Sequence, residues 1–327
     1  MSTNSKILLL IFIFGCNNSS ITEPTSSDSS LFISINQRNE PNNIIGGIKI
    51  FAKGADSESN RYIEYNIKHI LNESSNTDLW RLYELYESEN TSDSDIYSFK
   101  RVYDGKPIAN AGGWEFAIRE VGASDFIGEY HGDEKLKSVL LSVDGNPISI
   151  NDSQYIAENF SFEQNSELYS WHSGEIVALR KKQYIFSHSG LILNQRIEWL
   201  ASLNLNHAYM TMFPIKRKID GDSGDQITDT GVFYPSGYVQ DITNSGFDVN
   251  VSSNDNEVWI TGKDSNFRAE IKMNIYPTIS NYKLFISNTD AYNKVYFDIA
   301  GTGLNNYTTS IGEIWETSSS YKITTFN

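Results

Sequence analysis

The 327-residue sequence has little of several things: one cysteine, seven prolines, and only 26 Lys+Arg against 41 Asp+Glu. A single cysteine excludes an internal disulfide framework and a cysteine-based zinc site. A formal net charge of −15 argues against a general nucleic-acid-binding protein, because contacts to phosphates need a basic surface. The phosphate-binding P-loop, the G-x-S-x-G nucleophile elbow and the H-E-x-x-H zinc motif are also missing from the sequence.

What is abundant favours strands. Hydrophobic residues make up 39% of the chain, with 19 Tyr and 17 Phe, which is enough for a packed core. Apolar residues alternate with polar ones in several segments, as half-buried strands do. The segment from Asp78 to Tyr86 fits a helix or a strand, and its alternation favours a strand. The clearest alternating sets are Ile63, Tyr65 and Ile67; Trp114, Phe116 and Ile118; and Ala269, Ile271 and Met273.

Turn signals such as Asp144-Gly145 and Ser189-Gly190 separate these segments at short intervals, and no βαβ spacing is present. We therefore expect an all-β fold, an antiparallel β-sandwich or jelly roll, as one domain over residues 32–327. The sheets of such sandwiches often curve into a concave groove. A long groove suits a polymer better than a small metabolite.

The N-terminus has the features of an export signal. Lys6 precedes about eight apolar residues, a run too short to span a bilayer of roughly 30 Å. The run Ile13-Phe14-Gly15-Cys16 resembles a bacterial lipoprotein lipobox. This resemblance implies a signal peptide over 1–15, a lipid on Cys16, a flexible tether over 16–31, and a place in the outer membrane or at the cell surface. An ordinary signal peptide with an unrelated cysteine is the alternative.

The first candidate site lies in residues 112–134. A predicted strand carrying Arg119 leads into a loop that contains Tyr130, His131 and Glu134. A histidine beside carboxylates can be held in one tautomer and act as a base or an acid near neutral pH. Alternatively, His131 is an ordinary strand residue and Glu134 a solvated turn residue.

The second candidate site lies between Trp171 and Lys218. On one predicted strand, His207, Tyr209 and Thr211 share a face, while Ala208, Met210 and Met212 share the other and are expected in the core. Tyr209 is otherwise an ordinary exposed strand tyrosine. The further cationic candidates of this region are Arg196, Lys216 and Arg217.

Aromatic rings and oxygen-rich loops add two weaker hypotheses. Trp114, Trp171 and Trp199 would offer flat faces to sugar rings, although tryptophans more often lie in a core. The run Asp220 to Asp225 has the oxygen-rich spacing of a calcium loop but lacks the residues that an EF-hand needs. We expect no cofactor, and at most a structural calcium ion there.

The combination of a lipobox, a polar tether, a large β body and His, Tyr and Arg on strands resembles the secreted β-jelly-roll polysaccharide lyases. The motifs of the jelly-roll alginate lyases are absent, so the resemblance implies a different lyase family. It implies β-elimination on a uronic-acid-containing polysaccharide by a monomer. Arg119 or Arg196 would neutralise the sugar carboxylate, His131 would act as the base or the neutraliser, and Tyr209 as acid and base. Trp114, Glu134, His207, Trp199, Lys216 and Arg217 would bind the anionic chain.

Two other functions stay open. A sandwich-fold glycoside hydrolase needs two carboxylates about 5–10 Å apart, with Glu115, Glu134, Glu175 and Glu198 as candidates. A non-catalytic glycan-binding lipoprotein at the cell surface would use the tryptophans alone.

Overall fold

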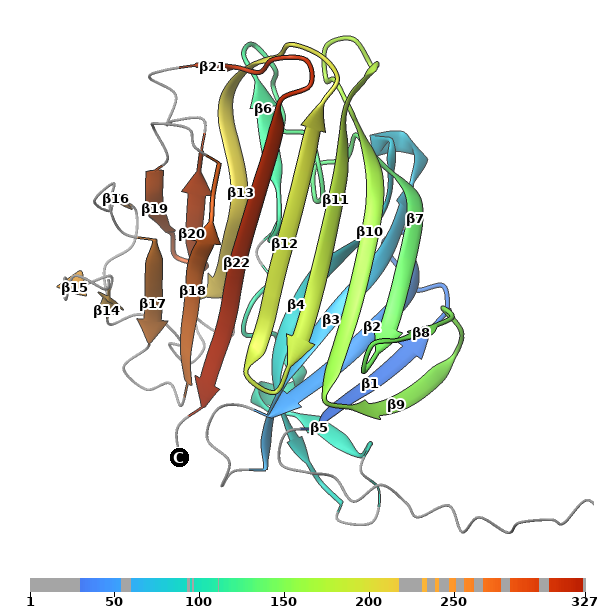
Figure 1. The fold of residues 1–327 in the computed structure, drawn as a ribbon. Helices are drawn as coiled ribbons and strands as arrows, with labels where there is room; N and C mark the ends of the chain where they lie inside the picture. The colour runs from blue at the N-terminus through green and yellow to red at the C-terminus, as the bar shows by residue number, and fades with distance from the viewer. Residues whose placement is uncertain are drawn as a thin grey trace, which may run out of the picture.

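The computed structural model describes residues 30–53, 60–92, 95, 97–110, 112–217, 231–233, 239–240, 247–250, 256–261, 267–277, 283–299 and 306–325. These residues form two β-sheets that pack against each other (Figure 1), which confirms the predicted all-β sandwich. Two single-turn 3-10 helices, η1 (Glu73–Ser75) and η2 (Tyr103–Gly105), are the only helices of the described part. No helix among these residues has the length and hydrophobicity needed to cross a bilayer.

The large sheet contains sixteen of the described strands, and its main path runs β15-β14-β17-β18-β22-β12-β11-β10-β7-β4-β3-β2-β1-β9. Neighbours are antiparallel except β4 and β7, which pair in parallel. The strands are β1 (Leu31–Asn36), β2 (Ile44–Lys53), β3 (Arg61–Asn72), β4 (Thr77–Asn90), β5 (Phe99–Arg101), β7 (Glu134–Val143), β8 (Asn146–Ile148), β9 (Ser153–Ala157), β10 (Asn159–Tyr169), β11 (Ile176–Ser187), β12 (Gly190–Trp199), β14 (Gly231–Phe233), β15 (Val239–Gln240), β17 (Glu257–Thr261), β18 (Phe267–Ile275) and β22 (Ile314–Thr325).

The small sheet has the order β16-β19-β20-β13-β21, with β6 also paired to β13. Its strands are β6 (Ala117–Glu120), β13 (Asn204–Lys216), β16 (Phe247–Asn250), β19 (Lys283–Asn288), β20 (Tyr292–Asp298) and β21 (Tyr307–Thr308). The long strand β13 therefore receives β20 on one side and the short strands β6 and β21 on the other. This arrangement positions the candidate site described below.

Local sequence signals explain much of this topology. The Asp144-Gly145 turn joins β7 to β8, and both of its residues have positive φ, where glycine costs little. The Ser189-Gly190 turn joins β11 to β12. The ambiguous segment from Asp78 to Tyr86 lies within strand β4, as its alternation predicts. Strand β1 begins at Leu31, one residue before the predicted domain boundary, and Leu31 is buried.

The inward face of the large sheet changes character along its strands. On β10, β11 and β12 it is apolar at one end, polar in the middle and apolar again at the other end. The two apolar ends belong to separate hydrophobic clusters. The polar middle layer, which is buried, consists of Gln164 and Ser166 on β10, Arg180 and Lys182 on β11, and Gln195 on β12.

One predicted strand is shorter in the structure than its alternation suggests. Only Ala117 to Glu120 pair as a strand, although Trp114, Phe116 and Ile118 are buried as expected. The reason is that the backbone N–H groups of residues 114–116 donate to the carboxylate of Glu129 and not to a neighbouring strand. The Glu129 carboxylate takes the place of a hydrogen-bonded neighbouring strand here, and the segment is an irregular loop.

Candidate functional site

Several predicted catalytic residues converge on the ring of Phe126. This ring stacks on Tyr209 of β13 at a centroid distance of 5.4 Å and lies 5.0 Å from the ring of His131. The guanidinium of Arg119, from β6, lies 5.0 Å from the Phe126 centroid. The loop between β6 and β7 therefore folds over β13 and brings Arg119, His131 and Tyr209 into one cluster, here called the Phe126 cluster.

Two histidines of this cluster are each paired with a carboxylate. His131 Nδ1 lies 2.9 Å from an oxygen of Asp125, and His207 Nδ1 lies 3.1 Å from an oxygen of Asp298. The second oxygen of Asp298, which is buried, accepts the backbone N–H of Ala208. A carboxylate at Nδ1 places the proton on that nitrogen and leaves Nε2 with a lone pair. Both imidazoles are thus oriented for proton transfer.

Tyr209 connects the two pairs. Its hydroxyl lies 3.2 Å from Nδ1 of His207, while its ring stacks on Phe126, which in turn contacts His131. A phenol beside one imidazole, with a second imidazole on the far side of the Phe126 ring, can exchange a proton with a bound substrate. The cluster therefore has the groups needed for general acid–base chemistry.

The protonation state of His131 suits a base. Burial lowers the pKa of His131 below its usual value, and Asp125 opposes this effect only in part. The positive charge of Lys294 acts in the same direction as burial. The imidazole is consequently neutral at neutral pH, the form that can accept a proton.

Aromatic rings extend the cluster in both directions. On one side Tyr209 contacts Tyr296 of β20 at 4.7 Å, and Tyr296 stacks on Phe285 of β19 at 4.8 Å. On the other side the ring of Tyr130, which is 59% exposed, lies 5.3 Å from His131. The result is a continuous row of rings from Phe285 through Phe126 to Tyr130, here called the aromatic row.

Cations flank this row. The guanidinium of Arg81, from β4, lies 5.2 Å from the centroid of Tyr130. Lys294 lies 5.0 Å from the centroid of Tyr296, and burial lowers the pKa of Lys294 to about 8 even though Glu129 opposes the shift. Lys294 thus changes its charge within a unit or so of neutral pH.

Buried carboxylates hold the loop that carries His131. Glu129 accepts the N–H groups of Trp114, Glu115 and Phe116 at 2.8 to 3.2 Å. Glu134 accepts the N–H of Glu129 at 3.0 Å and receives Arg180 Nη1 at 2.9 Å from both oxygens. The loop is therefore tied to the polar layer of the large sheet.

Glu115 shares this buried layer. Its carboxyl accepts the backbone N–H of Leu82 at 2.8 Å and lies 3.5 Å from Lys182 Nζ. Burial, followed by the negative charge of Glu129, raises the pKa of Glu115 well above its usual value, while that of Glu129 is lowered. Glu115 thus keeps its proton to higher pH than an exposed glutamate does.

The other predicted residues lie elsewhere. Arg196, on β12, contacts Glu198 at 3.0 Å and lines a separate polar cavity of about 340 Å³ on the large sheet. Trp114 and Trp199 are fully buried in the two hydrophobic clusters, so their faces are closed to a sugar. Glu134 is fully buried too, and it acts through the loop that it holds.

The remaining candidates are at the far end of β13 or on the periphery. Lys216 is half-buried, and Arg217 is buried and donates to Asn288. Trp171 is 40% exposed, and Glu175 lies in an exposed turn. Cys16 and the predicted calcium loop at 220–225 lie outside the described residues. Within the described ranges, no group of three His, Cys, Asp or Glu side chains is arranged to hold a metal ion.

Several residues of the site were not singled out from the sequence. Asp298, Tyr296 and Lys294 belong to β20, some 90 positions from His207, and only strand pairing places them beside β13. Asp125 and Phe126 lie in the loop of the first candidate site, residues 112–134. The signal that could have identified Asp125 is its spacing of six residues from His131, across a turn that contains Gly128.

No protein-family model matches the chain, and no curated protein matches it. Among solved structures it is similar to the galactosidase domain of the α-galactosidase-sucrose kinase AgaSK, with 12% identity, a TM-score of 0.48 and coverage of 88% of this chain and 41% of that chain. The GH36 α-galactosidase AgaA from Geobacillus stearothermophilus is similar at 9% identity, with a TM-score of 0.48 and coverage of 86% and 41%.

A galactose mutarotase-like protein from Lactobacillus casei is similar at 12% identity, with a TM-score of 0.41 and coverage of 84% of this chain and 99% of that chain. The chain spans about two fifths of the length of the α-galactosidase structures, 41% for both AgaSK and AgaA.

Proposed function

We propose that the Phe126 cluster is the acid–base centre of an enzyme that acts on a carbohydrate, and that it cleaves a uronic-acid-containing polysaccharide by β-elimination. The observation that supports this most is that two carboxylate-paired histidines, His131 and His207, lie against the ring of Phe126. Tyr209 and Arg119 lie against the same ring. Elimination needs a base, an acid and a cation at one sugar, and the cluster offers all three.

The reaction removes one proton from the sugar, at C5, and delivers one proton to the leaving oxygen. With Arg119 paired to the sugar carboxylate, the C5 proton becomes more acidic and His131 Nε2 accepts it. The electrons of the C5–H bond form the C4–C5 double bond, and the C4–O bond breaks. The leaving oxygen takes the proton of Tyr209, and exchange with water then restores both side chains.

The aromatic row supports a polymeric substrate. Flat rings bind the apolar faces of sugars, and the row from Phe285 to Tyr130 extends beyond the three reacting side chains. Arg81 and Lys294 flank the row but are buried, so they add positive charge beside an anionic substrate without contacting it directly. We retain the proposal that a lipid on Cys16 anchors a monomer at the cell surface, where a polymer is accessible.

The test uses the purified full chain and a panel of uronic-acid polysaccharides. Elimination gives an unsaturated product that absorbs in the ultraviolet, whereas hydrolysis gives new reducing ends without this absorbance. We expect Tyr209→Phe and His131→Ala to lower the rate by about 10²–10⁴-fold with nearly unchanged melting temperature. Tyr155→Phe, on β9 of the other sheet, is the matched control. Full activity in both cluster variants would remove the assignment.

A second candidate is glycan binding without chemistry, and the aromatic row is the observation that favours it. Retention of the chain on an immobilised glycan, with neither absorbance nor reducing ends, is its expected result.

A hydrolase with a glutamate pair has less support, because Glu115 and Glu134 are fully buried and Glu134 is paired with Arg180. New reducing ends that persist in Tyr209→Phe would favour it.

A further inference from the structure

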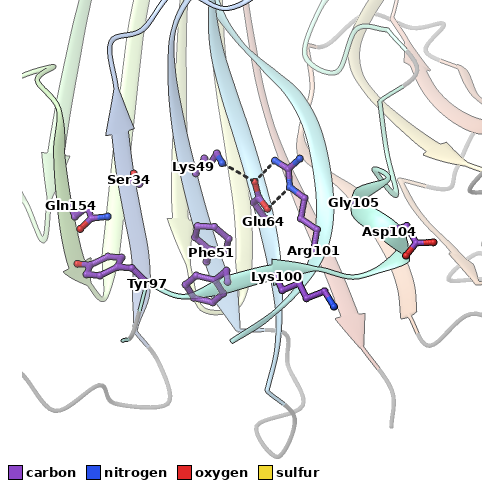
Figure 2. A pocket seen from close by; sticks show the side chains of 11 residues that line it. Ser34, Lys49, Phe51, Glu64, Tyr97, Lys100, Arg101, Asp104, Gly105 and Gln154 are labelled. Atoms are coloured by element: carbon purple, nitrogen blue, oxygen red, sulfur yellow. Dashed lines mark hydrogen bonds and ion pairs between the residues drawn. The ribbon is translucent and has the colours of Figure 1, made fainter. Parts of the chain in front are cut away.

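A second cavity lies on the large sheet, away from the Phe126 cluster. It has a volume of about 560 Å³ and is lined by β1, β2, β3, β5 and β9 together with Tyr97, Asp104 and Gly105 (Figure 2). This is within the range of about 300–1,000 Å³ that ligand pockets have. In Figure 1, β5 is at the lower end of the sandwich and β6, which carries Arg119, is at the upper end. The two sites therefore belong to different sheets and different ends of the molecule.

Aromatic rings form one part of this cavity. Phe51 of β2 and Phe99 of β5 stack in parallel at 4.0 Å, and Tyr97 and Phe99 both pack against Phe32 of β1. Phe51 is buried, whereas Phe99 and Tyr97 are half-buried and remain accessible from the cavity. Three rings, those of Phe32, Phe51 and Tyr62, thus support the two partly exposed ones, so the ring surface is rigid. Figure 2 shows Tyr97 beside Gln154 and Ser34, whose polar groups complete this end.

The charged side chains of the cavity are organised around Glu64. Its buried carboxylate receives Arg101 Nη2 at 2.6 Å and Nε at 2.9 Å, and Lys49 Nζ lies 3.9 Å away (Figure 2). Arg101 also lies 3.4 Å from the ring centroid of Tyr86, which fixes its guanidinium. Burial raises the pKa of Glu64, but the hydrogen bonds and charge of Arg101 outweigh it, so the pKa is lowered and the carboxylate stays ionised.

The net charge of the lining is positive. Three cations, Lys49, Lys100 and Arg101, meet two carboxylates, Glu64 and Asp104. This contrasts with the chain as a whole, in which 41 Asp+Glu exceed 26 Lys+Arg. Arg101 satisfies Glu64 with two hydrogen bonds, whereas Lys49 Nζ lies 3.9 Å from that carboxylate with its side chain 47% exposed. Lys100 is exposed. A positive lining beside accessible rings fits a ligand that has a flat face and a carboxylate.

We propose that this cavity is a second, non-catalytic saccharide-binding site that takes an acidic sugar unit. The ring of the sugar lies against Phe99 and Tyr97, its carboxylate binds Lys49 and Lys100, and its hydroxyls bind Ser34 and Gln154. The identification of the ligand as the polymer cleaved at the Phe126 cluster rests on the proposed function. The site would hold the polymer chain while another stretch of it is cleaved, which raises the effective concentration at the reacting end.

The experiment uses the full chain with Tyr209→Phe, so that bound polymer is not degraded. Binding of polygalacturonate, alginate and hyaluronate is measured by titration calorimetry, with neutral starch as the uncharged polymer. Lys49→Gln with Lys100→Gln removes the two cations, and Tyr97→Ala removes one ring. The matched control is Lys137→Gln with Lys181→Gln, two exposed lysines on β7 and β11.

We expect the Lys49/Lys100 variant to weaken binding of at least one acidic polymer about tenfold, the effect of losing charge-assisted hydrogen bonds. Tyr97→Ala weakens it as well, and the control pair leaves it unchanged. Unchanged affinity in both cavity variants, an equal loss in the control pair, equal binding of starch, or no binding of any acidic polymer would each overturn the proposal.

The two proposals fail separately. If the cavity variants lose affinity but the wild-type chain produces no unsaturated product, the second site stands and the lyase function does not. If the wild-type chain cleaves a polymer and the cavity variants bind it as tightly as Tyr209→Phe alone does, the lyase function stands and the second site does not.

Discussion

The ion pair between Arg180 and Glu134 allows a quantitative test of how the loop of the candidate site is held. Both side chains are fully buried, and Arg180 Nη1 lies 2.9 Å from both carboxylate oxygens. In Arg180→Met the carboxylate keeps three donors: the hydroxyl of Ser166, the N–H of Glu129 and, at 3.5 Å, the amide of Gln164. Breaking a buried pair by removing one partner costs about 3–5 kcal/mol, and the three surviving donors place the expected loss near 3 kcal/mol.

The measurement is urea unfolding followed by tryptophan fluorescence, with the free energy of unfolding taken at an unchanged slope. Lys181→Met is the matched control, because Lys181 follows Arg180 on β11 and pairs with Glu163 at 2.8 Å while 49% exposed. An exposed pair of this kind contributes about 0.2–1 kcal/mol. Adding Glu134→Gln to Arg180→Met removes the uncompensated charge and should recover part of the loss.

Because Glu134 also accepts the N–H of Glu129, Arg180→Met should loosen the loop that carries His131 and lower activity together with stability. Equal losses of unfolding free energy in Arg180→Met and Lys181→Met would refute the reasoning. So would a double variant that is less stable than Arg180→Met alone, since the carboxylate would then not be the source of the cost.

Three further predictions concern pH and the loop. Asp125→Asn removes the charge that raises the pKa of His131, so the pKa falls further and the acidic limb of the kcat/KM profile moves to lower pH; an upward shift would contradict this. The raised pKa of Glu115 means that wild-type stability declines as the pH rises above the usual value of 4.5. Glu115→Gln should therefore gain in stability relative to wild type as the pH rises from 4.5, as measured by urea midpoints. Gly132→Ala should cost about 3 kcal/mol or more, because its Cβ would lie 2.2 Å from a backbone oxygen at φ +97°, whereas Gly145→Ala, with φ +78° and open space, should cost only about 1 kcal/mol.

The parts of the fold that follow from local sequence were predictable. Alternation identified Asp78 to Tyr86 as a strand, and the Asp144-Gly145 turn follows from the ease with which glycine adopts positive φ. Alternation failed at Trp114 to Phe116, where the side chains are buried as expected but the backbone donates to Glu129. A side chain that replaces a strand partner leaves no periodic signal.

The candidate site was predictable only in part, because contacts between residues far apart in the sequence leave no local signal. His131 and Tyr209 were named from their chemistry, and the structure places both against Phe126. Asp298 could not be found, because its role depends on the pairing of β20 with β13. Arg196 has the right chemistry on a strand of the other sheet, so the sequence offered no reason to prefer Arg119 over it.

A bulge in β13 decides which side chains of that strand face the site. The register with β20 shifts between Tyr209 and Thr211. Before the shift, Ala208 and Met210 point into the core, so His207 and Tyr209 face the Phe126 cluster. After it, Phe213 and Ile215 point into the core.

Thr211 was expected to share the face of Tyr209, but it lies past the shift and contacts Ser319 Oγ of the large sheet at 3.1 Å. Without the extra residue, strict alternation would place Phe213 and Ile215 on the face of Tyr209. The bulge therefore lets one strand supply polar groups to the site at one end and fill the hydrophobic core at the other. Bulges of this kind often occur beside active sites, where they redirect a side chain.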